Sequence, residues 1–284
     1  MKLRYILTVA AVVGSIHASA ISQAEVRWHN ESNDTIVITR WLVDVSRTQP
    51  TPGAAMLAFA EKMTGLPYQG GTLEGEPERL TVNIDAFDCT TLVETAAALT
   101  RTLNEGRTSW RDFIYNLEQL RYRGGEVDGY ASRLHYFSEW IMDNVHRGNI
   151  IEVTDRIGAQ VSKQIKTLDF MSTHRDKYPA LNDSANYEAL KSVEIGYRSH
   201  RIPYIRTADL NKAQLRDGDI VAITTAMKNL DVIHVGIIKL INGVPHLVHA
   251  SSKAGKVIED PVTLADYLRH RRDATGIRVV RLKD

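Results

Sequence analysis

The sequence has a single cysteine, almost no net charge and no apolar run long enough to span a bilayer. Among 284 residues, Lys and Arg number 35 and Asp and Glu number 34, a formal charge of +1. This balance argues against a nucleic acid or an anionic membrane surface as partner. One cysteine excludes an internal disulfide. The sequence also lacks internal repeats, low-complexity tracts and a clear linker, and its 43% hydrophobic content is ordinary for a soluble globular protein.

The first 24 residues have the pattern of an export signal. Lys2 and Arg4 precede an apolar stretch at 5–16, and small residues follow, with cleavage expected after Ala20 or Ala24. The apolar stretch is too short for a transmembrane helix. We therefore predict a secretory signal peptide over 1–24 and an exported protein, in the periplasm or secreted, with no membrane contact after cleavage. The alternative is that the segment stays in place as an anchor. There is no cysteine near the cleavage site, which argues against a lipoprotein.

Hydrophobic periodicity divides the remaining chain into a helical first part and a strand-rich last part. We predict one domain over 25–284, with an N-terminal helical extension. Such an order, helices first and antiparallel strands later, defines an α+β protein. The expected helices cover 34–46, 53–64, 87–104, 110–121, 135–146 and 185–197, and the expected strands cover 219–224, 233–240, 246–250 and 276–281. The rest of 150–200 is interpreted as loops.

The lone cysteine lies at the start of the third predicted helix. Asp88 is a good N-cap residue, which puts Cys89 in the first helical turn. There the unpaired N–H groups and the positive helix end favour a thiolate and could stabilise an oxyanion. An exported lone thiol is otherwise exposed to oxidation. This position favours a nucleophile over the alternative, an inert apolar side chain in the core.

Two histidines follow on a predicted hairpin. Asn242 and Gly243 form a strong two-residue turn signal, which pairs residue 234 with residue 251. In that register His249 lies opposite Gly236, on the same face as His234 and diagonal to it, within reach of a second imidazole. A slip by one residue would send His249 to the other face. We predict His234 as the base for Cys89 and His249 as its orienting group, unless an Asn or Asp elsewhere fills that third role.

These residues resemble the three blocks of the NlpC-type papain-like cell-wall cysteine hydrolases. The blocks are 88–93 (DCTTLV), 234–237 (HVGI) and 249–251 (HAS), and the segment 65–71 is similar to the tyrosine-bearing loop of that superfamily. The likeness is closer to its N-acetylmuramoyl-L-alanine amidase-like branch, through 70–73, 85–91, 132–137 and 217–220. It covers roughly residues 55–284. Thr90-Thr91 matches this branch, whereas Ser-Gly is usual at these two positions in the wider superfamily.

The resemblance implies a papain-like fold with helices on an antiparallel sheet and a helical insertion after the nucleophile helix. It implies hydrolysis of the amide between N-acetylmuramic acid and L-Ala of the peptidoglycan stem peptide, through a thioester on Cys89. The catalytic set would be Cys89, His234 and His249, with muropeptides as the binding partner. The substrate-binding residues would be Tyr68, Asp88, Thr90, Ser132, Arg133, His135, Tyr136 and Ser251. Within that set, 132–137 could equally be an ordinary helix start.

Two other functions remain open at this level. The cut could lie within the stem peptide, between D-Glu and the diamino acid, or the protein could bind cell wall without catalysis. The presence of Cys89 with both histidines argues against the second. A role as a toxin would differ only in delivery. No metal-ligand spacing of Cys and His is present, so we predict no metal and no cofactor.

Overall fold

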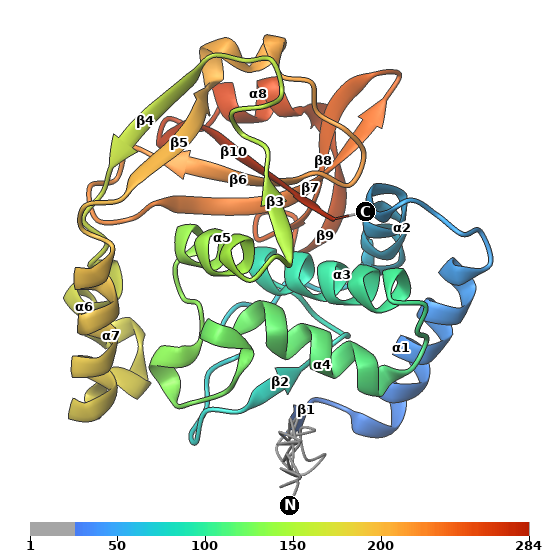
Figure 1. The fold of residues 1–284 in the computed structure, drawn as a ribbon, viewed down its shortest axis with the longest axis horizontal. Coiled ribbons are helices and arrows are strands. Elements are labelled where there is room, and N and C mark those ends of the chain that lie inside the picture. The colour runs from blue at the N-terminus through green and yellow to red at the C-terminus, as the bar shows by residue number, and fades with distance from the viewer. Residues whose placement is uncertain (1–25, 284) are drawn as a thin grey trace, which may run out of the picture.

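The computed structural model describes residues 26–283, and the predicted signal peptide lies outside the described residues. Helices and an antiparallel sheet form an α+β arrangement (Figure 1), as the sequence predicts. The helices are α1 (Glu31–Ser46), α2 (Pro52–Met63), α3 (Cys89–Asn104), α4 (Trp110–Arg121), α5 (Phe137–His146), α6 (Phe170–Thr173), α7 (Ser184–Gly196) and α8 (Leu264–Arg269). The strands are β1 (Val26–Trp28), β2 (Leu80–Val82), β3 (Ile150–Glu152), β4 (Val161–Ile165), β5 (Arg201–Arg206), β6 (Ile220–Thr225), β7 (Val232–Ile241), β8 (Val244–Ser251), β9 (Lys256–Thr263) and β10 (Ala274–Leu282).

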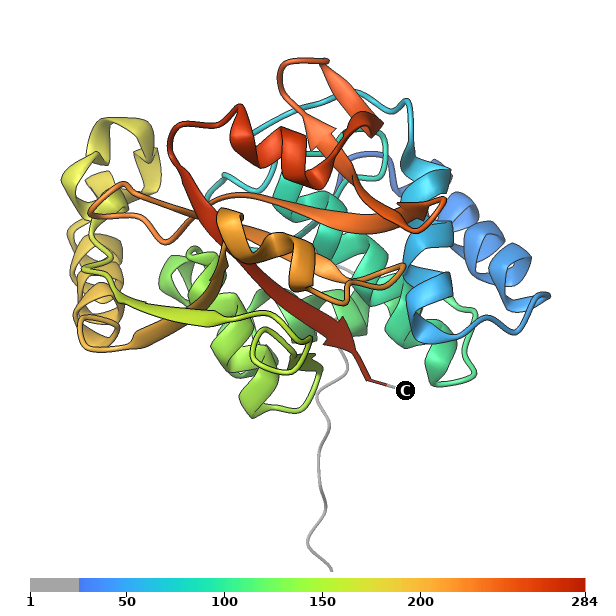
Figure 2. The same cartoon turned by 90° about the horizontal axis from the view of Figure 1, so that it is seen from above.

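Eight strands form the main sheet, in the order β4-β5-β10-β6-β7-β8-β9 with β3 beside β10. Strands β1 and β2 form a separate parallel pair. Helix α3 packs against β7 and β8 and lies between α2 and α4. Figures 1 and 2 show these helices under one face of the sheet and α8 over the other. The sheet is therefore covered on both sides, and α4 and α5 follow α3 in the sequence.

Burial on both faces explains why β6 is apolar without alternation. Ile220 and Ala222 pack into the core shared with the helices. Val221 and Ile223 belong to the second core, under α8. Successive strand side chains point to opposite faces, so a strand covered on both sides needs apolar residues throughout.

Six predicted helices and four predicted strands are present with shifts of a few residues at their ends. The interpretation of 150–200 as loops around one helix is wrong, because β3, β4 and α6 lie there. Strand β9 was also not predicted. It contains Pro261, which lacks a backbone donor and argues against a strand, but β9 is at the sheet edge, where proline is tolerated.

Candidate active site

The single cysteine begins helix α3, as predicted. The Asp88 carboxylate accepts from the Thr91 N–H at 2.8 Å, and the Thr91 hydroxyl accepts from the Asp88 N–H at 2.9 Å. This reciprocal capping box satisfies backbone donors that the first turn leaves unpaired. It fixes the end of the helix and thereby the position of the Cys89 side chain.

The sulfur of Cys89 lies against strand β7. It receives hydrogen bonds from the backbone N–H of Val235 and from the Thr90 side chain. Cys89 and His234 both line a cavity of about 620 Å³, and both also line a smaller one of about 190 Å³. The structure thus brings the predicted nucleophile and the predicted base to one cleft, although 145 positions separate them in the sequence.

Burial raises the pKa of Cys89 to about 11, and the negative charge of Asp88 acts in the same direction. The hydrogen bonds to the sulfur lower the pKa by less than burial raises it. The sequence led us to expect a thiolate at this helix end. Burial and the charge of Asp88 oppose that form, because desolvation disfavours the charged state.

The two histidines of the hairpin are in direct contact, in the predicted register. Ile237 pairs with Val248 and Ile241 with Val244. The Nε2 atom of His234 is 2.6 Å from Nδ1 of His249. Opposite His249 is Gly236, where a Cβ atom would lie only 3.2 Å from the Cβ of His249. Glycine at 236 therefore leaves room for the His249 ring to reach His234.

A carboxylate completes the chain of polar contacts, and sequence reasoning did not identify it. Nε2 of His249 is 3.1 Å from Oδ2 of Asp260 on β9. The other oxygen, Oδ1, accepts from the Val262 N–H at 3.0 Å. The backbone carbonyl of Asp260 accepts a hydrogen bond from Nδ1 of His246 at 3.0 Å. Asp260 is therefore held at its carboxylate and its backbone.

This chain determines which ring nitrogens carry protons. An ionised Asp260 only accepts hydrogen bonds, so Nε2 of His249 donates to it. Nδ1 of His249 then accepts from Nε2–H of His234. The remaining nitrogen of His234, Nδ1, is left unprotonated and available as a base.

Two β-bulges adjust the strands beside these groups. The register of β7 against β6 shifts between His234 and Val232, which makes Ile233 the extra residue. The register of β9 against β8 shifts between Glu259 and Thr263, a segment that contains Asp260. Bulges turn a side chain away from its regular direction and occur often next to active sites. Here the two bulges lie beside His234 and around Asp260.

Burial favours the uncharged form of both imidazoles. Burial, then the charges of His249 and Arg271, lower the pKa of His234 to about 3. Burial also lowers the pKa of His249, and Asp260 opposes this effect. The ring of Tyr267 on α8 packs edge-on against His249 at 5.4 Å between centroids. Burial therefore favours the uncharged form of both Cys89 and His234.

Tyr68 and Ser251 also lie at the larger cavity. The Tyr68 N–H donates to the Gly255 carbonyl at 2.9 Å, and Pro67 bridges to Lys256. Burial raises the pKa of Tyr68. The Ser251 hydroxyl accepts from the Ala254 N–H at 3.2 Å, which closes the turn between β8 and β9.

The segment 132–136 is divided between the cleft and the protein interior. His135 and Tyr136 line the smaller cavity, whereas neither cavity includes Ser132 or Arg133. His135 Nε2 is 2.8 Å from the Tyr130 carbonyl, and burial keeps its pKa well below the ordinary value. The Tyr136 hydroxyl donates to Glu194 at 2.7 Å. Ser132 closes a turn, donating to the Gly129 carbonyl at 2.7 Å.

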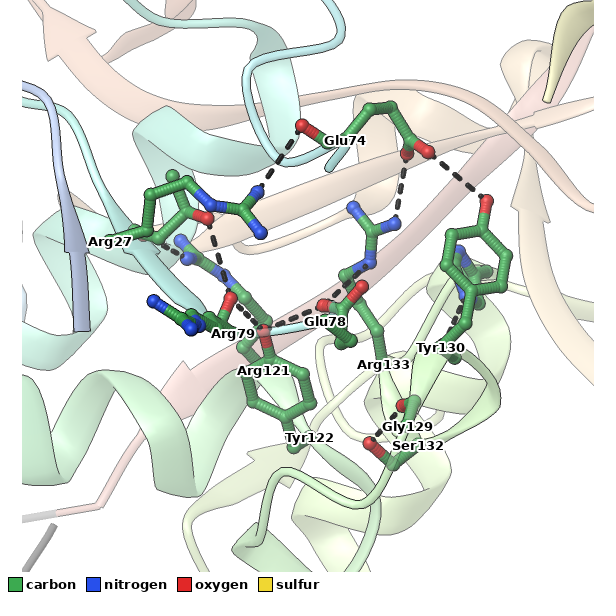
Figure 3. A network of polar contacts seen from close by, with 12 residues as sticks. Arg27, Glu74, Glu78, Arg79, Arg121, Tyr122, Gly129, Tyr130, Ser132 and Arg133 are labelled. Carbon is green, nitrogen blue, oxygen red and sulfur yellow. Dashed lines mark hydrogen bonds and ion pairs between the residues drawn. The ribbon is translucent and has the colours of Figure 1, made fainter. Parts of the chain in front are cut away.

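Arg133 lies in a buried ionic network away from Cys89. Figure 3 shows its guanidinium between Glu74 and Glu78, with N–O distances of 2.9 Å and 3.4 Å. The Glu74 carboxylate also accepts from the Tyr130 hydroxyl at 3.4 Å. The side chain of Arg133 is only 6% exposed. Its charge is matched within the protein, so this residue ties the loop before β2 to the segment before α5.

Across residues 26–283 no group of three or more His, Cys, Asp or Glu side chains could hold a metal ion. In the same range no helix is long and apolar enough to cross a membrane.

The fold and this cleft define an α+β protein in which a helix-borne thiol faces a chain of two imidazoles and a carboxylate. Residues 58–277 match the AmiA-like family, described as N-acetylmuramoyl-L-alanine amidase-like. The match spans most of the chain, and the protein belongs to this family.

Solved structures agree with this assignment. An N-acetylmuramoyl-L-alanine amidase from Bacteroides uniformis is 37% identical, with a TM-score of 0.77 over 82% of this chain and 99% of that one. A Bacteroides fragilis protein designated a candidate xylanase is 38% identical, with a TM-score of 0.74 over 80% of this chain and 100% of that one. A Legionella pneumophila protein at 22% identity, with a TM-score of 0.68 over 89% and 96%, shares the fold. No curated protein matches the sequence.

The family assignment and the Bacteroides uniformis amidase support a hydrolase that acts on amide bonds, with peptidoglycan as the substrate.

Proposed function

We propose that this protein is a cysteine N-acetylmuramoyl-L-alanine amidase with an NlpC-type papain-like fold. It cuts the amide between the lactyl group of N-acetylmuramic acid and L-Ala of the stem peptide. The observation that carries this proposal is the chain from His234 through His249 to Asp260, in the cleft that also contains Cys89. This arrangement supplies a nucleophile, a base and the groups that orient the base.

The chemistry follows from the proton positions. As the Cys89 sulfur attacks the lactyl carbonyl carbon, Nδ1 of His234 takes the thiol proton. The tetrahedral intermediate collapses, the C–N bond breaks, and His234 returns the proton to the leaving amine of L-Ala. A thioester remains on Cys89. Water then attacks the thioester carbonyl while His234 accepts a proton, which releases the lactyl carboxylic acid and regenerates the thiol.

The neutral resting pair fits this sequence of steps. Burial raises the pKa of Cys89 and lowers that of His234, so it favours the neutral form of both groups before substrate arrives. Deprotonation is then coupled to attack. Backbone N–H groups at the start of α3 and the Tyr68 hydroxyl are the donors we assign to the developing oxyanion.

The experiment is a digest of purified muropeptides with the wild type and with Cys89→Ala, analysed by mass spectrometry. The proposal requires free stem peptide plus intact sugar, and no product from Cys89→Ala. A dipeptide left on muramic acid would instead support the endopeptidase that cuts between D-Glu and the diamino acid. Undiminished wall lysis by Cys89→Ala would support a binding protein whose activity does not use the thiol.

We also propose that the protein acts after export, in the periplasm or outside the cell. The support is the charged, apolar and small-residue pattern of 1–24 together with a substrate found in the cell wall. Fusion of 1–24 to a reporter enzyme that is active only outside the cytoplasm tests this, and an inactive reporter would contradict export.

A further inference from the structure

Helix α8 lies over the face of the sheet that carries the two imidazoles. Side chains alternate along a strand, so His234 points to the same face as Ile238, and His249 to the same face as Leu247. Ile238 and Leu247 both pack in the second core, under α8. The side chain of α8 that reaches the histidines is Tyr267. The histidine pair is thus contacted by an element other than its own strands and the helix of Cys89.

The ring of Tyr267 contacts both imidazoles at once. It stacks on the His234 ring, with 6.1 Å between centroids and 28° between planes. It meets the His249 ring at 81° between planes. The two imidazoles are themselves nearly perpendicular, at 86°. Aromatic rings attract each other at such separations in stacked and edge-to-face arrangements. One phenol ring therefore constrains both imidazole planes, and with them the line of the bond between Nε2 of His234 and Nδ1 of His249.

The hydroxyl end of Tyr267 is held as well. Nη1 of Arg271 donates to this hydroxyl at 2.8 Å, and the guanidinium lies 5.6 Å from the centre of the Tyr267 ring. Arg271 is in turn ion-paired with Asp273 at 3.8 Å. The backbone carbonyl of Asp273 accepts from the Ala226 N–H at 2.9 Å, directly after β6. The ring is therefore connected to the sheet at its hydroxyl end, through Arg271 and Asp273.

The surroundings of His234 make its protonation sensitive to this ring. Burial is the largest cause that lowers its pKa, and the charges of His249 and Arg271 act in the same direction. Strand β6 presents only the apolar Ile223 opposite His234. Tyr267 lines the larger cavity beside both imidazoles, so loss of its ring opens space for water there. The titratable side chains around His234 are Cys89 from α3, His249 from β8, Tyr267 from α8 and Arg271 beyond it, with Asp260 of β9 acting through His249.

We propose that Tyr267 is a positioning residue: its ring holds the imidazoles of His234 and His249 in their bonded arrangement and keeps water from the bond between them. Arg271 holds the ring in place. This inference rests on the proposed amidase mechanism, in which His234 acts on the thiol of Cys89, and deepens it. Tyr267 exchanges no proton and needs no contact with the substrate. Its effect therefore belongs in kcat and in the titration of His234, and not in KM.

The test compares Tyr267→Ala with Tyr267→Phe, which keeps the ring, and with Leu268→Ala. Leu268 is the next residue of α8, is 2% exposed and packs in the second core, so its truncation loosens the helix without removing the ring. For each protein we measure kcat and KM for release of stem peptide from a muropeptide, and urea unfolding. We also follow the protonation of His234 against pH by ¹⁵N NMR, with His234→Asn to assign its signals. The NMR titration needs no turnover.

Tyr267→Ala should lower kcat about tenfold, the upper range for loss of an aromatic pair, with KM within about twofold of the wild type. The NMR midpoint of His234 should rise by at least about one pH unit, because hydration favours the charged imidazole. Tyr267→Phe should keep the wild-type midpoint and lower kcat only about threefold, for the lost hydrogen bond to Arg271. Leu268→Ala should lower the free energy of unfolding and leave the midpoint unchanged.

An unchanged midpoint in Tyr267→Ala, or an equal rise in Leu268→Ala, overturns the inference. A higher KM with unchanged kcat in Tyr267→Ala also overturns it, since this result would make Tyr267 a substrate contact alone. If Tyr267→Ala does not fold, Arg271→Gln replaces it and should raise the midpoint, whereas Arg269→Gln, an exposed change on the same helix, should not. Failure of the wild type to release stem peptide overturns the proposed amidase function, and the NMR midpoints still decide this inference.

Discussion

Replacement of Asp260 by Asn tests whether the carboxylate sets the protonation pattern of the two histidines. Oδ1 of Asp260 accepts from the Val262 N–H, and Asn can keep this bond with its own oxygen. The Asn amide nitrogen then takes the place of Oδ2, 3.1 Å from Nε2 of His249. Two N–H groups cannot face each other there, so His249 must move its proton from Nε2 to Nδ1.

That change reverses the chain of hydrogen bonds. Nδ1–H of His249 then donates to Nε2 of His234, which puts the His234 proton on Nδ1 and removes the free lone pair at that position. The loss of a hydrogen bond to a charged group is worth about 1.5–3 kcal/mol. Converted to rate, this predicts a fall in kcat of about 10- to 160-fold for Asp260→Asn.

The assay is steady-state release of stem peptide from a muropeptide, with urea unfolding measured in parallel. Glu259→Gln is the control, because Glu259 is the neighbouring acid on β9 and pairs with Lys239 at 2.7 Å, not with a histidine. KM should be unchanged, since Asp260 acts through His249. A kcat for Asp260→Asn within twofold of the wild type, at unchanged stability, would refute the assigned proton positions.

Three further changes have defined outcomes. The rate at which iodoacetamide alkylates Cys89 should rise about tenfold per pH unit from pH 7 to pH 9, because a pKa of about 11 leaves about one thiolate in ten thousand at pH 7. A plateau of this rate below pH 8 would contradict a resting thiol. Burial raises the pKa of Glu139 to about 7, so the wild type should lose up to about 3 kcal/mol of stability as pH rises from 4.5 to 7. In urea titrations this loss should be absent from Glu139→Gln, and an equal slope in both proteins would rule it out. Arg121→Met should lower the free energy of unfolding by about 3–5 kcal/mol in the same assay, because it leaves Glu94 buried without its partner at 2.6 Å. The added change Glu94→Leu should recover most of this loss. No recovery would count against the ion pair as the cause.

Local patterns in the sequence were sufficient to predict that Cys89 begins α3 and that His234 contacts His249. Asp88 predicted the start of α3, and the turn at Asn242 and Gly243, both with positive φ, predicted the register of β7 and β8. Both features depend on residues close together in the sequence. The contact between His234 and His249 followed from them because strand pairing has a fixed geometry.

The missing parts depend on contacts that a local pattern does not encode. Asp260 was not identified because Pro261 beside it hid an edge strand, and a bulge then re-aimed its side chain. Arg133 pairs with Glu74 and Glu78, which lie more than 50 positions away. Nothing near Arg133 distinguishes an arginine bound inside the protein from one that waits for a substrate.

The proposed nucleophile and the proposed base belong to different layers of the protein: the thiol of Cys89 comes from the helical side, and both imidazoles and the carboxylate come from the sheet. No covalent or metal crosslink joins the two layers among the described residues, and the packing of α3 on β7 and β8 is what holds them together. The rate of turnover by the proposed mechanism therefore depends on how closely the two layers pack. A slight loosening of the contact between α3 and the two strands would separate the Cys89 sulfur from the His234 ring while every helix and strand was still intact.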